Sequence, residues 1–335
     1  MKKYELTQDS ILWEGRTLFR IRRLADSVVG GFVEHEGNLS HDDACWIWGD
    51  AKAFDSARVL NDALMFGLSQ LTNNAILCDR AQMYSNSICR DNAIVRNFSQ
   101  LYDNAIVEGS AILVGSAQLF GTSSARDGAF IQDGLLFGSS EVRHSGRVLG
   151  NSSLNGTTRI ENSAVVEGHA FLLNVAMRDY TRVYGNPSLS DIEMRGFSSV
   201  GDSAFVSNIN LRENVMIFGD ASVFTTSGGR QTLRNNVKIY DSARVEATPF
   251  SPTICDNNAR VFGNARIFGG MTQILNNGKV YGNAVIENAR VMDNAQVFGN
   301  AYLAWDTTVN GSTILSGGVH ITHGFITSMI PFMFE

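Results

Sequence analysis

Histidine is the side chain of this sequence best suited to moving a proton at neutral pH, because free imidazole titrates near pH 6.5. The chain holds 6 histidines. Two precede residue 45, two lie in short polar segments in mid-chain, and two lie three residues apart near its end: His35, His41, His144, His169, His320 and His323. A histidine becomes an effective general base only when a second group orients its ring.

The sequence offers little chemistry for metals or disulfides. His320 and His323 fit on one short strand, but a zinc site needs a third protein ligand. The 4 cysteines show no CxxC spacing: Cys45, Cys78, Cys89 and Cys255. We therefore predict no metal site and no disulfide framework, and this cysteine usage favours a reducing cytoplasm.

Charge and hydropathy restrict the partners. The net charge is −6 and no basic cluster is visible along the sequence, which argues against nucleic acid and anionic membranes. Met1-Lys-Lys is followed by a polar run rather than the apolar core of a signal peptide. The apolar segment 325–334 is too short to cross a bilayer. We expect a cytoplasmic chain without membrane or nucleic-acid partners.

The elements that position these residues follow from a six-residue period. Fourteen consecutive positions hold only alanine or serine: Ala51, Ala57, Ala63, Ser69, Ala75, Ala81, Ser87, Ala93, Ser99, Ala105, Ala111, Ala117, Ser123 and Ala129. A mostly apolar residue lies two positions after each. This period fits neither a helix of 3.6 residues per turn nor an ordinary sheet.

One repeat shows the physical reason. In the segment 289–300, Ala289 and Val291 point to one face of a short strand and Arg290 to the other. Asp293-Asn294 then turns the chain, because these residues tolerate the left-handed backbone of a tight corner. Three such strands make a triangular coil of about 18 residues. We predict a parallel β-helix of about 15 or 16 coils, with residues 1–44 and 326–335 capping a solenoid over 45–325.

Outward positions distinguish one face of the predicted prism. An aromatic residue recurs there about once per coil: Trp48, Phe66, Tyr84, Tyr102, Phe120 and Phe137. An apolar strip of this length is larger than a monomer usually exposes, so it predicts a homo-oligomer interface. The alternative is a ring stack that only stiffens the sheet.

The period breaks three times between Phe224 and Val280. The irregular segments are 225–234, 247–255 and 269–275, and each is followed by a paired asparagine corner: Asn235-Asn236, Asn257-Asn258 and Asn276-Asn277. We expect the three bulges to stack on one side, as a binding site or as tolerated insertions.

The repeat resembles that of the hexapeptide-repeat acyltransferases, which are left-handed β-helices. Val297-Phe-Gly-Asn-Ala-Tyr302 and Val261-Phe-Gly-Asn-Ala-Arg266 match its aliphatic-to-small pattern. Leu18-Phe-Arg-Ile21, Asn38-Leu-Ser40 and Cys45-Trp-Ile-Trp48 are similar to the opening segment of the YdcK group, a branch of long solenoids regarded as acetyltransferases.

The resemblance implies a left-handed coil, a trimer or dimer, and transfer of an acyl group from acetyl-CoA or another acyl-CoA to a small-molecule acceptor, with no permanently bound cofactor. In that family a histidine deprotonates the acceptor. His169, which follows a glycine near Glu167, is the first candidate here and His144 the second. Arg230, Arg234 and Arg266 are candidates for the coenzyme phosphates.

Two other functions stay open. A non-catalytic structural or interaction solenoid fits the regular repeat, and there each corner histidine only occupies the place of an asparagine. A saccharide-binding β-helix would use Trp46, Trp48, Tyr84 and Tyr102 as stacking platforms.

Overall fold

The computed structural model of the protein describes residues 2–226, 230–248 and 254–327. These residues form a parallel β-solenoid of about 16 turns, which confirms the predicted β-helix. The one helical element among them is the 3₁₀ turn η1 (Glu36–Asn38). By its internal contacts the chain divides into unit 1, residues 1–167, and unit 2, residues 168–335.

Short strands and tight corners alternate because the sequence alternates branched and turn residues. In β10 (Gln82–Met83) and β13 (Gln100–Leu101), each residue pairs in register with the residue 18 positions later. Corner residues such as Asp103 adopt a left-handed backbone, with φ 54°. Gly121 holds a similar corner one turn on, where an added Cβ would lie 2.8 Å from a backbone oxygen of the next corner.

The alanine and serine ladder lines the interior as expected. The inward residues Ala75, Ser87 and Ala105 are fully buried, and so is Cys89 between two strands. Burial raises the pKa of the Cys89 thiol, so the thiol stays protonated and behaves as a small apolar group.

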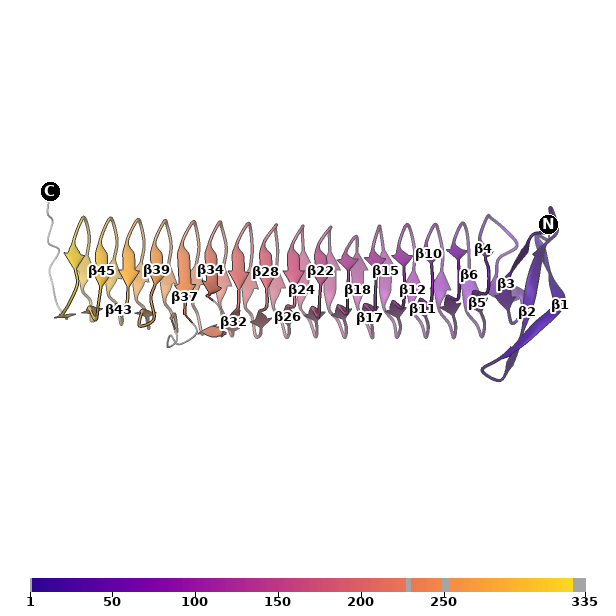
Figure 1. The fold of residues 1–335 in the computed structure, drawn as a ribbon, viewed down its shortest axis with the longest axis horizontal. Coiled ribbons are helices and arrows are strands. Elements are labelled where there is room, and N and C mark those ends of the chain that lie inside the picture. The colour runs from indigo at the N-terminus through magenta and orange to yellow at the C-terminus, as the bar shows by residue number, and fades with distance from the viewer. Residues whose placement is uncertain (1, 227–229, 249–253, 328–335) are drawn as a thin grey trace. The chain divides into compact units, whose positions relative to one another are not determined.

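Unit 1 begins with an antiparallel hairpin that continues into the solenoid (Figure 1). The strand after the hairpin, β3 (Val29–Val33), pairs in parallel with β5 (Lys52–Ala53). The strands of this first sheet, A1, are β1 (Tyr4–Trp13), β2 (Arg16–Arg23), β3 (Val29–Val33), β5 (Lys52–Ala53), β8 (Gln70–Leu71), β11 (Ile88–Cys89), β14 (Ile106–Val107), β17 (Ser124–Ala125), β20 (Glu141–Val142) and β23 (Arg159–Ile160).

Two further parallel sheets complete the turns of unit 1. Sheet B1 holds β6 (Arg58–Val59), β9 (Ile76–Leu77), β12 (Ile94–Val95), β15 (Ile112–Val114), β18 (Phe130–Gln132), β21 (Arg147–Leu149) and β24 (Val165–Glu167). Sheet C1 holds β4 (Trp46–Ile47), β7 (Leu64–Met65), β10, β13, β16 (Gln118–Leu119), β19 (Leu135–Leu136) and β22 (Ser153–Asn155).

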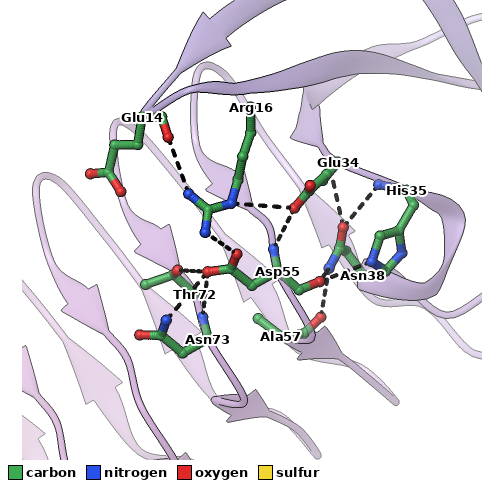
Figure 2. A network of polar contacts seen from close by, with 9 residues as sticks. All are labelled: Glu14, Arg16, Glu34, His35, Asn38, Asp55, Ala57, Thr72 and Asn73. Carbon is green, nitrogen blue, oxygen red and sulfur yellow. Dashed lines mark hydrogen bonds and ion pairs between the residues drawn. The ribbon is translucent and has the colours of Figure 1, made fainter.

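A polar network fastens the hairpin to the first turns (Figure 2). The Arg16 guanidinium lies 2.5 Å from the Asp55 carboxylate, which also accepts a 2.7 Å bond from the Thr72 hydroxyl. The buried Asn38 amide donates to the backbone oxygens of Asp55 and Ala57, each at 2.9 Å. These contacts pair the Arg16, Asn38 and Asp55 side chains within unit 1, so the network is structural.

Unit 2 repeats the arrangement with longer strands near its irregular turns. Sheet A2 holds β26 (Ala176–Met177), β29 (Glu193–Met194), β32 (Ile209–Arg212) and β35 (Gln231–Arg234). Sheet B2 holds β27 (Arg182–Val183), β30 (Ser199–Val200), β33 (Met216–Ile217), β36 (Lys238–Ile239), β38 (Arg260–Val261), β41 (Lys279–Val280), β44 (Gln296–Val297) and β47 (Ile314–Leu315).

The third side of unit 2 and its last sheet account for the remaining strands. Sheet C2 holds β25 (Phe171–Leu173), β28 (Ser188–Ser190), β31 (Phe205–Ser207), β34 (Ser222–Thr225), β37 (Arg244–Ala247), β39 (Arg266–Phe268), β42 (Val285–Glu287), β45 (Tyr302–Ala304) and β48 (His320–Ile321). Sheet D2 holds β40 (Gln273–Ile274), β43 (Arg290–Val291), β46 (Thr308–Val309) and β49 (Phe325–Ile326).

The three paired asparagine corners align in unit 2. The Asn235 amide donates to Asn257, and the Asn257 amide donates to Asn276, each at 3.0 Å. The bulge residues 227–229 and 249–253 lie outside the described residues, and so do residues 328–335 of the predicted C-terminal cap.

Candidate ligand-binding groove

The two candidate base histidines occupy exposed corners. His144 lies in unit 1 with φ 56°, and its ring Nε2 lies 3.9 Å from the Asp127 carboxylate. His169 lies in unit 2, where its backbone N–H donates to Gly185 at 2.8 Å. This register places His169 beside Asn186 on the next turn. His169 therefore occupies a corner position that asparagine holds on the next turn of unit 2.

The other histidines serve local contacts. His35 bonds the Asp55 backbone oxygen through Nε2, and His41 stacks on Tyr4. His320 lies edge-on to Tyr302, and His323 contacts Thr322. Across residues 2–226, 230–248 and 254–327, no group of three or more histidine, cysteine, aspartate or glutamate side chains is placed to hold a metal ion.

The three candidate phosphate-binding arginines have different surroundings. Arg234 forms an ion pair with the nearly buried Asp256 at 2.8 Å, and Arg230 is exposed. Arg266 borders a cavity of about 330 Å³ together with Arg244, Glu246, Ile267 and Phe268. Within the described part of unit 2, no hydrogen bond or ion pair joins these arginines to His169.

The predicted aromatic ladder of unit 1 exists, and its rings cover one another. Ring centroids from Phe66 to Phe137 are 4.6–4.9 Å apart, with planes within 5° of parallel. Each ring is consequently only half-exposed. Trp46 is 2 % exposed, so it cannot serve as a sugar platform. This geometry favours the stiffening role, and the homo-oligomer interface stays a prediction.

Unit 2 carries a second aromatic ladder, which the sequence reading missed. Its rings are 4.7–5.0 Å apart and lie on the outer face of sheet B2: Phe218, Tyr240, Phe262, Tyr281 and Phe298. Their spacing in sequence runs from 17 to 22 residues, because the irregular turns lengthen the coils. A search for a fixed 18-residue repeat therefore passes over them.

A column of cations runs beside this second ladder. Lys238 pairs with Arg260, and Arg260 with Lys279, on adjacent parallel strands. Their positions are therefore about 4.8 Å apart. Arg260 is exposed and the two lysines are half-exposed. Among the residues that the structure describes, no carboxylate lies within 4.0 Å of these three side-chain cations.

An asparagine ladder flanks the cations on the other side. Each side-chain amide donates to the next, at 2.9–3.2 Å, along Asn214, Asn236, Asn258, Asn277 and Asn294. One N–H and one carbonyl of each inner amide are used in this way. The second N–H and a lone pair remain directed at solvent or a ligand.

The asparagine ladder and the cation column enclose a groove, which we call the B2 groove. Two adjoining depressions of about 350 and 270 Å³ share Asn258, Arg260 and Asn277. Met216 and Lys238 line the first depression, and Lys279 and Gln296 the second. The paired asparagine corners noted in the sequence were the signal that could have located it, since each precedes one cation of the column by two residues.

In unit 1, a comparable column of charged side chains is fully paired. There arginine and glutamate alternate, with Glu108 bonded to Arg90 at 2.7 Å and to Arg126 at 2.8 Å. Arg126 also reaches Glu141 at 3.3 Å. The B2 groove departs from this pattern, because three cations adjoin without a counterion. No basic cluster is visible along the sequence because the fold gathers these three cations from positions 19 and 22 residues apart.

Comparison with known proteins gives no further assignment. No protein-family model matches the chain, and no curated protein matches it significantly. Within the described residues no helix is long and apolar enough to span a bilayer.

Proposed function

We propose that this chain is a binding solenoid that takes an extended anionic ligand in the B2 groove. The observation that carries the proposal is the unpaired column Lys238–Arg260–Lys279. Like charges on directly opposed strand positions destabilise a sheet. A polyanion lying along the column would offset this repulsion at every turn.

The surroundings of the column support the same function. The ring stack on one side and the amide ladder on the other fix the strands that carry the cations. A binding surface that is ordered before the ligand arrives loses less conformational entropy on binding. The regular spacing of the cations suits a ligand whose charges repeat along a line.

Inorganic polyphosphate tests the proposal, with affinity measured by titration calorimetry at low salt. We expect binding by the native chain and about ten-fold or greater loss in the Arg260→Gln variant. Arg58→Gln is the matched control, because Arg58 is an exposed first residue of a strand in sheet B1. Absence of polyphosphate binding, or equal loss in both variants, would contradict the proposal.

One observation supports a second candidate function, the acyltransferase of the hexapeptide-repeat family. Arg266 shares a cavity with the aromatic ring of Phe268, a combination suited to a phosphate and the base of an acyl-CoA, while Arg244 in the same cavity pairs with Glu246 at 3.3 Å. A ligand that binds only the folded chain raises its melting temperature. We expect acetyl-CoA to raise it in the native chain and not in Arg266→Gln. No shift at millimolar acetyl-CoA would exclude this function.

A further inference from the structure

A pair of exposed aromatic rings continues the B2 groove at one end. Tyr180 and Phe197 stack with centroids 5.3 Å apart and planes 6° from parallel. They are 63 % and 62 % exposed, unlike the half-buried rings of both ladders. The Phe197 backbone N–H donates to Glu213, which places the ring in register with Asn214, the first amide of the asparagine ladder.

The two rings and the groove form one surface within unit 2. On sheet B2, Arg182 pairs with Ser199, Ser199 with Met216, and Met216 with Lys238. The corner beside these strands runs from Tyr180 through Phe197 into the asparagine ladder as far as Asn294. These seven positions are separated by six intervals of about 4.8 Å, so the surface is about 29 Å long.

The chemistry of this surface is ordered along its length. Apolar ring surface lies at one end, because the amide of Asn214 is too small to cover the adjoining face of Phe197. Amides with a free donor and a free acceptor follow the rings along the corner, from Asn214 to Asn294. The run of adjoining cations lies in the far half, at Lys238, Arg260 and Lys279, whereas a single exposed arginine, Arg182, lies on the turn of Tyr180.

From this order, and resting on the proposed function, we infer that the anionic ligand is an acidic polysaccharide. The C–H face of a sugar ring packs on the electron-rich face of an aromatic ring. Hydroxyl groups both donate and accept, as the free positions of the amide ladder require, whereas phosphate oxygens only accept. Carboxylates or sulfates of later residues would reach the cation column.

Single-stranded nucleic acid fits the surface less well. Its recognition uses aromatic platforms that stack successive bases alongside the cations that follow the backbone. In the described part of unit 2 the exposed ring pair and the column Lys238–Arg260–Lys279 occupy different turns, and Arg182 is the one cation of that strand column on a turn with an exposed ring. Only the terminal base of a strand would find a platform.

The test compares hexagalacturonate, inorganic polyphosphate and an oligothymidylate on the native chain and on Tyr180→Ala/Phe197→Ala. We expect the double variant to bind hexagalacturonate about ten-fold more weakly and polyphosphate with less than two-fold change. Phe98→Ala, which removes another exposed corner ring in unit 1, is the control and should change neither. Phe197→Tyr should retain hexagalacturonate binding, because it keeps the ring face.

The outcomes separate the inference from the function on which it rests. If polyphosphate binds and hexagalacturonate does not, the polysaccharide inference fails and the polyanion function stands. Equal loss of both ligands in the double variant also overturns the inference, because the rings would then only support the fold. Tighter, ring-dependent binding of oligothymidylate overturns it in favour of nucleic acid. If no ligand binds, both proposals fail.

Discussion

Several serines of the inward ladder carry a hydroxyl into an interior that offers it no partner. Among the described residues, the buried Oγ atoms of Ser69, Ser87, Ser99 and Ser123 accept and donate no hydrogen bond. Alanine fills the equivalent inward slot one turn away from Ser99, at Ala81 and Ala117. The hydroxyl of Ser99 is therefore a desolvated polar group without a stabilising contact.

Ser99→Ala should raise the free energy of unfolding by about 1 kcal/mol, because burying an unpaired hydroxyl costs about 1–3 kcal/mol. Ser140→Ala is the matched control. The Ser140 hydroxyl is equally buried but donates to the Phe137 backbone oxygen at 2.7 Å. Its removal should lower the free energy by about 1 kcal/mol. Denaturant midpoints measure both, and a lower midpoint for Ser99→Ala would show that its hydroxyl is paired.

Arg260 lies between two lysines, so its replacement should affect stability and binding in opposite directions. Arg260→Gln removes two like-charge contacts and should raise the free energy of unfolding of the unliganded chain by about 0.2–1 kcal/mol at low salt. The gain should disappear in 1 M salt, where the Debye length is about 3 Å. Arg90→Gln, which breaks the ion pair with Glu108, should shift the denaturant midpoint the other way. A destabilised Arg260→Gln would mean that Arg260 has a counterion.

At the scale of elements, the ring ladders make the sheets sensitive to alkaline pH. Burial raises the pKa of Tyr84 and Tyr102 in unit 1, and of Tyr240 and Tyr281 in unit 2, above the ordinary value of 10.0. For Tyr240 the charge of Asp241 adds to the rise and Arg260 opposes it. The stacked rings therefore favour the neutral phenol.

This shift predicts the direction of the pH dependence. A tyrosine with a raised folded-state pKa contributes its full stability below pH 10 and loses it as the pH rises through the folded-state value. The denaturant midpoint should therefore fall above pH 10, and absorbance at 295 nm should report late ionisation. Tyr84→Phe with Tyr102→Phe should reduce the fall. An unchanged pH profile in that variant would remove these two rings as its cause.

The ladder of unit 1 also tests the predicted homo-oligomer. Only the outer edges of its rings reach solvent, so an interface there would use edges rather than faces. If the chain self-associates through this ladder, Tyr84→Glu with Tyr102→Glu should lower the sedimentation coefficient to that of a single chain. Ile88→Glu, a half-exposed strand residue on sheet A1, is the control. The same coefficient in native chain and double variant would reject the interface.

At the scale of the whole molecule, ligand binding should depend steeply on salt. Neutralising a charge on a flexible polyanion releases counterions, with a slope of about −0.7 per contact in a plot of log affinity against log salt concentration. Three cations in the B2 groove predict a slope of about −2 for polyphosphate. Arg260→Gln should make it shallower by about 0.7. A slope near zero would show that the cations do not contact the ligand.

The solenoid was predictable because its determinants are local and repeated. An inward alanine, a branched residue such as Val107 and a corner such as Asp103 each impose the same geometry wherever they recur. The aromatic ladder of unit 1 followed from the same register, because its coils keep about 18 residues.

The B2 groove was not predictable in the same way. Lys238 and Arg260 are 22 residues apart, and Arg260 and Lys279 are 19 apart, so no constant period links them. Their adjacency depends on how much chain each bulge absorbs, which composition and spacing do not reveal. Exposure is similarly hidden, since composition and spacing do not reveal that Trp46 is 2 % exposed and Phe197 62 %.

The in-register stacking of unit 2 has a consequence for how such a chain changes length. Strand positions of sheet B2 pair with their counterparts one turn away, as Lys238 does with Arg260 and Arg260 with Lys279. Deletion of residues 260–278 would remove one cation of the column, one ladder ring and one asparagine pair together, and would leave Lys238 opposite Lys279. Deletion of a whole turn therefore keeps the register of the column, and it would shorten the ligand that fits by one repeat.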